Sequence, residues 1–295
     1  MALLEHHPPG IEISWLYSQD EYLNWERDSD FSGRRTKEEQ ICNLLRSSRR
    51  PFLFLSGMCV FCKRESNFLL DSRYGQGQRD SLDFQPNWRE RLICTRCNLS
   101  NRARFIYFIL ESIPKNSKIW ITEQDTSLFR AIKLKYPNLI GSEYLSIDGI
   151  SGTIDERGIR HEDINQSSFK GESLETVICL DVLEHVPNVS SAIKELHRVL
   201  KNQGVCIATF PFERQSDKTI ERAIKNQDGS ITYFAPPEYH GNPLLKEEIL
   251  CYRHFGWDVV EKFKEAGFQS AKVGLGWSEH FLNLGPEQIV LVAVK

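Results

Sequence analysis

The sequence lacks any long apolar run. No stretch approaches the roughly 18 consecutive apolar residues that a membrane-spanning helix requires, so we expect no membrane span. The opening residues, MALLEHHPPG, lack the basic region and apolar core of a secretory signal, and we therefore expect a cytoplasmic protein. Internal repeats and low-complexity segments are also missing, which excludes repeat architectures.

Nor does the sequence carry a strong excess of charge of one sign. Its formal net charge is -3, which gives no global reason to expect nucleic acid or an anionic membrane as a partner. The 295 residues are 40% hydrophobic and 26% charged, an ordinary globular composition. A chain of this length can bury one large core, or one core and a small satellite domain.

The cysteines are too few, in a chain this long, for a disulfide scaffold. Four of the eight fall in two C-x2-C pairs that 31 residues separate: Cys59, Cys62, Cys94 and Cys97. Two such turns can point four thiolates at one tetrahedral zinc ion. A thioredoxin-like redox centre is the alternative, but it would use one pair and leave the other unexplained. The spacing predicts a structural zinc site, with no open position for catalysis.

We expect two segments before the main domain. Residues 1–50 are rich in aromatic side chains, include a short helix at 37–45, and either dock on the main core or cover a substrate pocket. Residues 51–114 form the zinc-binding module and a linking helix at 100–113. Between residues 59 and 104, nine basic residues stand against five acidic ones. This excess suits either a nucleic-acid footprint or an ordinary solvated domain, and we favour the second.

In residues 115–295, apolar runs alternate with amphipathic stretches. The run Val177–Leu180, a helix that Ser190 or Ser191 can cap, and the run Val205–Phe210 form a βαβ unit. Such units are right-handed, so the sheet should be parallel with helices on both faces and ligands at the strands' carboxyl ends. Other expected strands cover 119–122, 139–144, 158–161, 270–277 and 288–294. We expect the last two to form an antiparallel hairpin joined through Pro286.

The stretch LDVLEHVP…AIKELHRVLKNQG…FPF, within residues 174–212, resembles the second half of class I S-adenosylmethionine (SAM) dependent methyltransferases of the type 11 group. The resemblance covers about Lys118 to Lys295. It implies an α/β fold: a Rossmann-like, seven-stranded, mostly parallel sheet with helices on both faces. Beside it would lie the small, zinc-ribbon-like N-terminal module. The resemblance also implies SAM as cofactor, in addition to the structural zinc ion that the cysteine spacing predicts.

The same resemblance indicates where the cofactor binds. Glu143 ends the second strand, where the family binds the ribose diol, and Asp163 corresponds to the acid that meets the adenine, with Ile164 beside the ring. The loop after the first strand, ITEQDTSLF, keeps the family's acid but lacks its glycines. The predicted cofactor-binding residues are Glu123, Gln124, Asp125, Glu143, Tyr144, Asp163, Ile164 and Asp181.

Three residues are candidates for catalysis: His185, Tyr239 and His240. His185 can accept a proton, lock its turn by hydrogen bonds, or bind a divalent ion, because Asp181, Glu184 and His185 resemble the acid-acid-His set of ubiquinone-type O-methyltransferases. Tyr239 and His240 lie in a long insertion at 212–255, which we expect to form either a lid or a loop packed on the sheet edge.

The sequence thus predicts an enzyme, a SAM-dependent methyltransferase that acts on an oxygen or nitrogen of a small molecule. Three alternatives stay open. One is an RNA or tRNA methyltransferase that docks through the zinc module. Another is a SAM-binding protein that kept the fold and lost the chemistry, which the missing glycines permit. The third transfers the aminocarboxypropyl arm of SAM. The sequence does not predict the oligomeric state.

Overall fold

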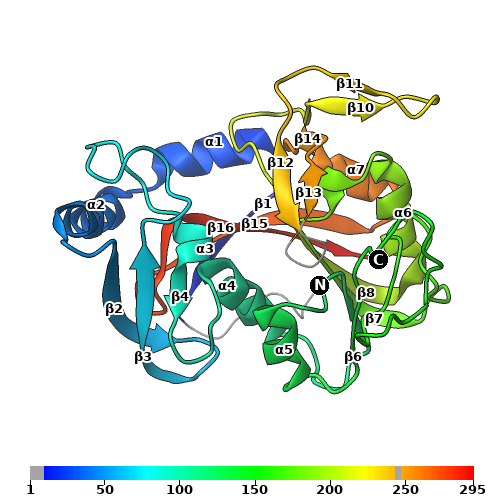
Figure 1. The fold of residues 1–295 in the computed structure, drawn as a ribbon, viewed down its shortest axis with the longest axis horizontal. Helices are drawn as coiled ribbons and strands as arrows, with labels where there is room; N and C mark the ends of the chain where they lie inside the picture. The colour runs from blue at the N-terminus through cyan, green and yellow to red at the C-terminus, as the bar shows by residue number, and fades with distance from the viewer. Residues whose placement is uncertain (1–9, 243–246) are drawn as a thin grey trace. The chain divides into compact units, whose positions relative to one another are not determined.

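The computed structural model describes residues 10–242 and 247–295 (Figure 1). Residues 1–9, where the sequence predicts no secretory signal, and residues 243–246 of the predicted insertion lie outside the described residues. The chain divides into two compact units. Unit 1 comprises Met1–Ser14, Glu26–Pro114 and Gly274–Ile289, and unit 2 comprises Trp15–Trp25, Lys115–Val273 and Val290–Lys295. Every helix in the described ranges is too short or too polar to cross a bilayer.

A seven-stranded mixed sheet, in the order β1-β15-β16-β8-β7-β5-β6, confirms the predicted Rossmann-like fold. Strands β6, β5, β7 and β8 run parallel, and β16 pairs antiparallel with β8. Strand β7 is an almost continuous run of buried side chains, as expected for a strand covered on both faces. The seven strands are β1 (Glu12–Leu16), β5 (Ile119–Ile121), β6 (Leu139–Gly141), β7 (Leu174–Leu180), β8 (Leu200–Thr209), β15 (Ser270–Ser278) and β16 (Asn283–Val294).

The predicted strand at 158–161 is wrong. This segment makes only a single parallel bridge to the main sheet, between Glu143 and His161. Its backbone groups are used locally instead: the N–H of His161 donates to the carbonyl of Thr153 at 2.8 Å, and Ile154 bridges Arg160. A local hairpin thus forms where a strand of the main sheet was predicted. The seventh strand of that sheet is β1, which the sequence did not predict.

The predicted link between the last two strands is also wrong. Pro286 lies inside β16, and residues 279–282 join β15 to β16. Leu282, with a φ of 49°, makes the turn. The exposed Pro286 is tolerated because β8 pairs only with residues 291–294 of β16, so no β8 partner needs the N–H group that proline lacks.

The helices of unit 2 lie between its strands along the chain. They are α5 (Ser127–Lys133), the 3-10 turn η2 (Leu183–His185), α6 (Val189–Val199) and α7 (Val259–Glu265). The predicted caps of α6 are wrong: the Asn188 side chain, rather than Ser190 or Ser191, accepts the N-terminal hydrogen bond, from the Ser191 N–H at 3.1 Å. Asparagine caps a helix as well as serine does, so sequence alone did not decide between them.

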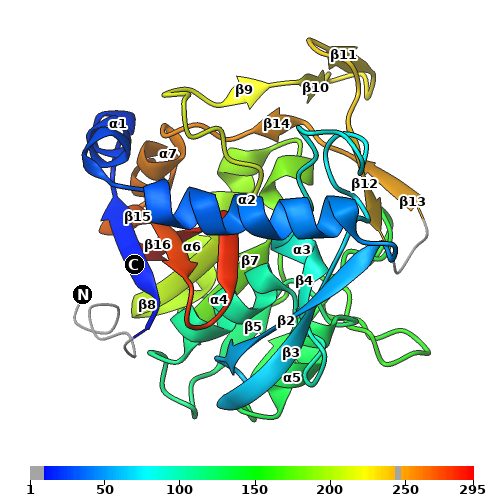
Figure 2. The same ribbon diagram turned by 90° about the vertical axis from the view of Figure 1, so that its left-hand side faces the viewer.

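In its described residues, the insertion between β8 and α7 contains six short strands. Its two ends are held together by an isolated parallel β-bridge between Phe212 and Phe255. The hairpin of β10 and β11 lies at the outer edge of the insertion (Figures 1 and 2). The six strands are β9 (Ile220–Glu221), β10 (Ala223–Lys225), β11 (Ile231–Tyr233), β12 (Tyr239–Asn242), β13 (Glu247–Leu250) and β14 (Arg253–His254).

Unit 1 contains a small antiparallel sheet, β2-β3-β4, and its own hydrophobic core. Helix α1 (Gln19–Asp28) falls partly in each unit. The other elements of unit 1 are α2 (Ser32–Ser47), β2 (Phe52–Cys59), β3 (Arg64–Asp71), α3 (Trp88–Arg91), β4 (Leu92–Cys94) and α4 (Asn101–Leu110). Phe68, Trp88 and Leu284 are among the buried side chains that pack around two of the paired cysteines, Cys59 and Cys94.

Candidate functional site

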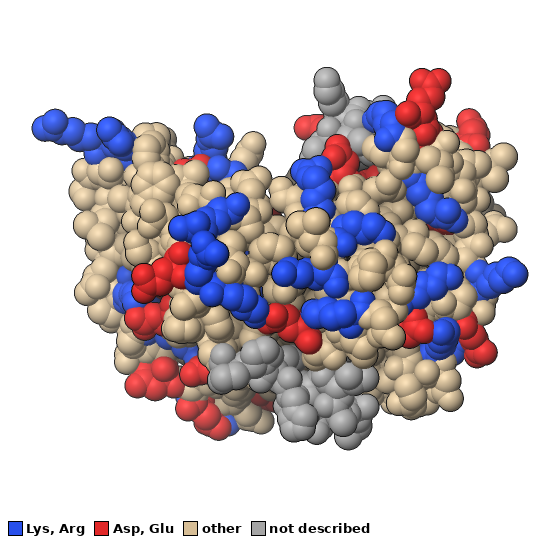
Figure 3. Space-filling model, turned by 90° about the horizontal axis from the view of Figure 1, so that it is seen from below, with Lys and Arg blue, Asp and Glu red and all other residues tan. Residues whose placement is uncertain are grey.

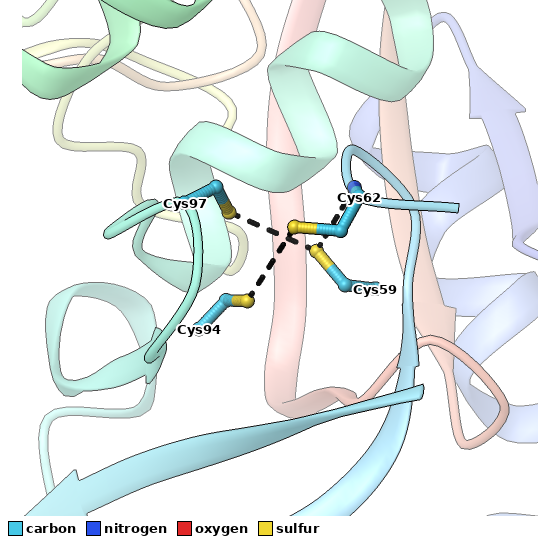
Figure 4. Close-up of side chains that lie close together, drawn as sticks. All are labelled: Cys59, Cys62, Cys94 and Cys97. Atoms are coloured by element: carbon cyan, nitrogen blue, oxygen red, sulfur yellow. Dashed lines mark hydrogen bonds between the residues drawn. The ribbon is translucent and has the colours of Figure 1, made fainter. Parts of the chain in front are cut away.

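The four paired cysteines converge in unit 1 (Figure 4). Their sulfur atoms lie 3.8 Å apart for Cys59 and Cys97, and 3.9 Å apart for Cys62 and Cys94. A tetrahedral zinc site with Zn–S bonds of about 2.3 Å has sulfur–sulfur edges of about 3.8 Å. A disulfide would bring two sulfurs to about 2.05 Å. The cluster therefore has the dimensions of a four-thiolate metal site.

The two C-x2-C turns have the same backbone geometry. The residue after each pair, Lys63 or Asn98, has a left-handed φ of 54° or 57°. Its N–H donates to the carbonyl of the first cysteine of the pair, Cys59 or Cys94, at 2.9 Å. This repeated turn aims both thiols of a pair at one point. The asparagine at position 98 indicates such a turn from the sequence, because asparagine tolerates a left-handed φ. The lysine at position 63 gives no such indication.

A fully buried cation, Arg104, accompanies the cysteine cluster. Its guanidinium donates to the backbone carbonyls of Leu92 at 2.7 Å and Leu282 at 2.8 Å. Burial lowers the pKa of Arg104 to about 10, while the cysteine thiolates act in the opposite direction. Arg104 therefore stays charged near neutral pH and offsets the negative charge that four thiolates bring. The sequence had indicated Arg104 only as part of a basic excess.

The loop after β5, which contains no glycine, is held by hydrogen bonds to side chains. Glu143 Oε1 accepts hydrogen bonds from the backbone N–H groups of Gln124 at 2.7 Å and Asp125 at 3.1 Å. The Gln124 side chain donates to the Gly158 carbonyl and accepts from the Arg160 N–H. Burial raises the pKa of Glu143, and the two N–H groups oppose that shift.

Other residues predicted to bind the cofactor make hydrogen bonds to residues close to them in the sequence. Glu123 Oε1 accepts from the Thr126 hydroxyl at 2.5 Å, and Thr126 in turn caps α5. Asp163 accepts from the N–H of Asn165 at 2.8 Å, next to the buried Ile164. Half of the Tyr144 side chain is exposed. The structure thus places Glu123, Gln124, Asp125 and Glu143 together around the loop after β5.

Asp181 ends β7 in a left-handed conformation, with a φ of 50°. Its N–H donates to the Thr209 carbonyl, and its carboxylate accepts from the Thr209 hydroxyl, both at 2.9 Å. These bonds fix the end of β7 against the end of β8. The chain then turns into η2, which carries Glu184 and His185.

His185 and His240 meet across 55 positions of sequence. The Nε2 atom of His185 lies 3.1 Å from Nδ1 of His240 on β12, and the two rings are nearly perpendicular. The Nδ1 atom of His185 lies 2.8 Å from the Leu250 carbonyl. Glu184, whose side chain is fully buried, places Oε1 3.7 Å from His185 and 3.9 Å from His240. Burial lowers the pKa of His185, and the bond to Leu250 opposes that shift.

A chain of hydrogen-bonded side chains continues outward from this pair. His240 Nε2 lies 3.0 Å from Glu238, and His254 lies between Glu238 and Glu213 at 3.1 Å from each. Burial raises the pKa of Glu238, but hydrogen bonds from His240 and His254 outweigh it, so the net pKa is lowered. Glu238 was among the candidate residues that the sequence offered in the insertion, whereas Glu213 and His254 gave no spacing signal.

Buried Arg253 attaches the insertion to the η2 turn. Its guanidinium donates to the backbone carbonyls of Leu183, Val186 and Pro187, at 3.3, 2.6 and 3.2 Å. It also donates to the Glu221 carboxylate at 3.2 Å. The sequence offered one indication that Arg253 is buried and bonded, namely its charge within the largely apolar stretch Leu250–Phe255, and this indication was missed. The insertion is therefore fixed to the turn that bears His185.

Tyr239 does not join His240 at the pair. The two residues are neighbours on β12, and successive side chains of a strand point to opposite faces. The neighbouring Tyr233 raises the pKa of the Tyr239 hydroxyl. A catalytic role for Tyr239 stays a prediction.

Comparison with known proteins identifies a methyltransferase segment. Residues 142–208 match a protein family described as a methyltransferase domain. Two solved structures with similar chains are SAM-dependent methyltransferases from Thermotoga maritima and Mesorhizobium loti. The first is 16% identical with a TM-score of 0.38, covering 66% of this chain and 88% of its own. The second is 12% identical with a TM-score of 0.38, covering 63% and 94%. No curated protein matches the chain.

Proposed function

We propose that this chain is a SAM-dependent methyltransferase that transfers a methyl group to an oxygen or nitrogen of a small molecule. The family match covers the segment from the end of β6 to β8, which includes the turn after β7. The observation that carries the proposal is the His185–His240 pair, 3.1 Å apart, beside the carboxyl end of β7. Open α/β sheets bind their ligands at this edge.

The residues near the first loop fit the cofactor. The Glu143 carboxylate uses Oε1 for two backbone N–H groups. Because each carboxylate oxygen has two lone pairs, Oε2 is left to accept from a ribose diol. Gln124 fixes the loop through hydrogen bonds of its side chain to the Gly158 carbonyl and the Arg160 N–H. When bound, SAM would supply an electrophilic methyl group.

The His185–His240 pair is proposed to act on the methyl acceptor. Methyl transfer is an in-line displacement, so its rate depends on the position of the acceptor and on loss of the acceptor's proton. The imidazole nitrogens and the Glu184 carboxylate are the groups of this chain that can hold a proton or orient an acceptor there. Arg253 keeps the insertion, and with it His240, in place for this role.

The charges of unit 1 favour a small molecule over RNA. Of the nine basic residues between 59 and 104, Arg91 pairs with Asp71, Arg102 with Glu90, and Lys63 with Glu111. Arg104 is fully buried. Acidic and basic side chains also both occur across the face in Figure 3. Without these pairs and Arg104, five basic residues remain against three acidic ones, so the local basic excess falls from four to two.

We also propose that Cys59, Cys62, Cys94 and Cys97 bind a structural zinc ion, as their tetrahedral spacing supports. The cytoplasm, which keeps thiols reduced, is the compartment that suits this site.

The test is methyl transfer from labelled SAM to a panel of hydroxyl- and amine-bearing small molecules. His240→Ala should lower turnover by at least about 100-fold, while calorimetric affinity for S-adenosylhomocysteine stays nearly unchanged. His197→Ala, on the far helix α6, is the matched control and should keep full turnover. If His240→Ala loses cofactor affinity and keeps its saturated turnover, the insertion is a cofactor clamp. Cofactor binding without any methylated acceptor would favour the non-catalytic or aminocarboxypropyl alternatives.

A further inference from the structure

Three electron-rich atoms converge between the η2 turn and β12. The Leu250 carbonyl can only accept a hydrogen bond, so His185 carries its proton on Nδ1 and presents a bare Nε2. The Glu238 carboxylate likewise holds the His240 proton on Nε2 and leaves Nδ1 bare. These two bare nitrogens face each other at 3.1 Å, and the buried Glu184 carboxylate stands beside both.

The spacing of these atoms matches a metal ion. His185 Nε2, His240 Nδ1 and Glu184 Oε1 form a triangle with sides of 3.1, 3.7 and 3.9 Å. The point equidistant from its corners lies about 2.1 Å from each, which is the usual bond length from zinc to imidazole nitrogen or carboxylate oxygen. A shared proton would lie between the two nitrogens and would not reach Glu184. We propose that Glu184, His185 and His240 bind a divalent transition-metal ion.

The surroundings of the three atoms are those of a built metal site. Each imidazole donates its second N–H to a fixed acceptor, Leu250 or Glu238, which sets the tautomer and ring orientation that metal ligands require. Exposure rises from 0% for the Glu184 side chain to 12% for His185 and 34% for His240, so the site is closed at one end and open to solvent at the other.

The ligand set narrows the class of metal. Two imidazoles and one carboxylate suit zinc, manganese or iron(II), whereas magnesium and calcium prefer oxygen ligands. Three protein ligands leave further positions open, unlike the four cysteines of unit 1. If the proposed methyl transfer is correct, an acceptor hydroxyl bound beside this ion would have a lowered pKa and lose its proton more readily. That last step rests on the proposed function, whereas metal binding itself does not.

Metal binding is therefore tested without SAM or acceptor. Protein that retains its cysteine-bound zinc is dialysed against EDTA and then titrated with MnCl2, and separately with ZnCl2, in a calorimeter. We expect one additional ion per chain for at least one of the two salts. Loss of an outer partner of a metal ligand costs about 10–100-fold in affinity, so His240→Ala and Glu184→Gln, which remove ligands, should cost at least tenfold. His197→Ala should bind as the wild type does.

Two outcomes overturn the proposal. One is a wild type that takes up neither ion, which would mean that the two imidazoles share a proton. The other is a wild type that binds no more tightly than His240→Ala or Glu184→Gln. Thermal unfolding checks that each variant is folded, and His240→Asp, which restores a ligand oxygen, should regain part of the affinity. Failure of methyl transfer with intact metal binding would leave this site standing and remove only the proposed reaction.

Discussion

Glu143 holds the loop after β5 in this structure and is also the proposed partner of the cofactor's ribose. Its Oε1 atom holds the glycine-poor loop through two backbone N–H groups, at 2.7 and 3.1 Å. The cofactor's ribose would then use the other oxygen. The acid that the family resemblance assigned to the diol thus also compensates for the missing glycines. The sequence could indicate Glu143 as a cofactor ligand, but not that its carboxylate also holds the loop after β5.

Glu143→Ala should therefore weaken binding of S-adenosylhomocysteine by about tenfold or more, because hydrogen bonds to a charged group contribute about 1.5–3 kcal/mol each. Calorimetric titration measures the affinity. Glu143→Gln keeps an oxygen for the loop and should lose less. An unchanged affinity in a folded Glu143→Ala variant would show that the cofactor binds elsewhere.

Glu195 on α6 gives a pH-dependent contribution to stability. Its carboxylate accepts from Arg198 and from the Ser167 hydroxyl, all at 2.6 Å. Burial raises the pKa of Glu195, but these hydrogen bonds outweigh it and bring the net pKa below the usual 4.5. The folded state therefore binds fewer protons than the unfolded state in this range. The stabilisation is present above pH 4.5 and is lost as the pH falls toward the folded-state pKa.

Glu195→Gln should lower the free energy of unfolding at neutral pH by about 1.5–3 kcal/mol. Urea unfolding of wild type and variant, compared at neutral pH and below pH 4.5, measures this difference. The gap between the two proteins should narrow in acid. Glu261→Gln, which removes an exposed carboxylate on α7, should have little effect at either pH. A gap that is constant with pH would contradict the assignment.

At the scale of elements, Arg253 on β14 fixes the insertion. Its guanidinium donates to three backbone carbonyls, one in η2 and two just after it. The Arg253 side chain is only 4% exposed. Arg253→Met should leave these carbonyls without their donor and cost about 1–3 kcal/mol of stability. Limited proteolysis should then cut within residues 212–255 faster than in the wild type. Lys225→Met, which alters an exposed cation of the same insertion, is the control. Equal cleavage of wild type and Arg253→Met would show that other contacts hold the insertion.

Elements with a strong local pattern were predictable, and elements without one were not. The apolar run of β7, the amphipathic α6 and the apolar end of β8 each carry their own signal, so the sequence predicted all three. The strands of the insertion have two to four residues and no periodicity. The meeting of His185 with His240 depends on how those strands pair. Both histidines could be named as candidates, but their contact, and the chain through Glu238 to His254, could not.

The segment 158–161, which was predicted as a strand, also shows that a local pattern alone does not decide which backbone groups pair. Its apolar and polar residues fit a short strand, yet the turn at Asp155 competes for the same backbone groups: Asp155 accepts from the N–H of Ile159 at 2.9 Å. Local closure has a low entropic cost, so it forms in preference to a long-range pairing of equal length. Only the structure shows which pairing prevails.

At the scale of the whole molecule, each unit has its own hydrophobic core, and the core of unit 1 is built around cysteines. Cys59 and Cys94 are fully buried and pack with Phe68, Trp88 and Leu284. Four converging thiols that are not held by a metal repel each other as they ionise, so the fold of unit 1 should depend on zinc. Binding free energy at such a site is largely folding free energy.

Elemental analysis of protein purified without added metal should find about one zinc per chain that resists EDTA, as a single four-cysteine site implies. Cys94→Ser should lose this zinc and yield insoluble or partly unfolded protein. Cys42→Ser changes a buried cysteine of the same core that lies outside the cluster, and it should keep its zinc. Loss of zinc in both variants would show that the metal only reports the integrity of the core. A wild type that is free of EDTA-resistant zinc and fully stable to heat would remove the four-cysteine site from the account of this fold.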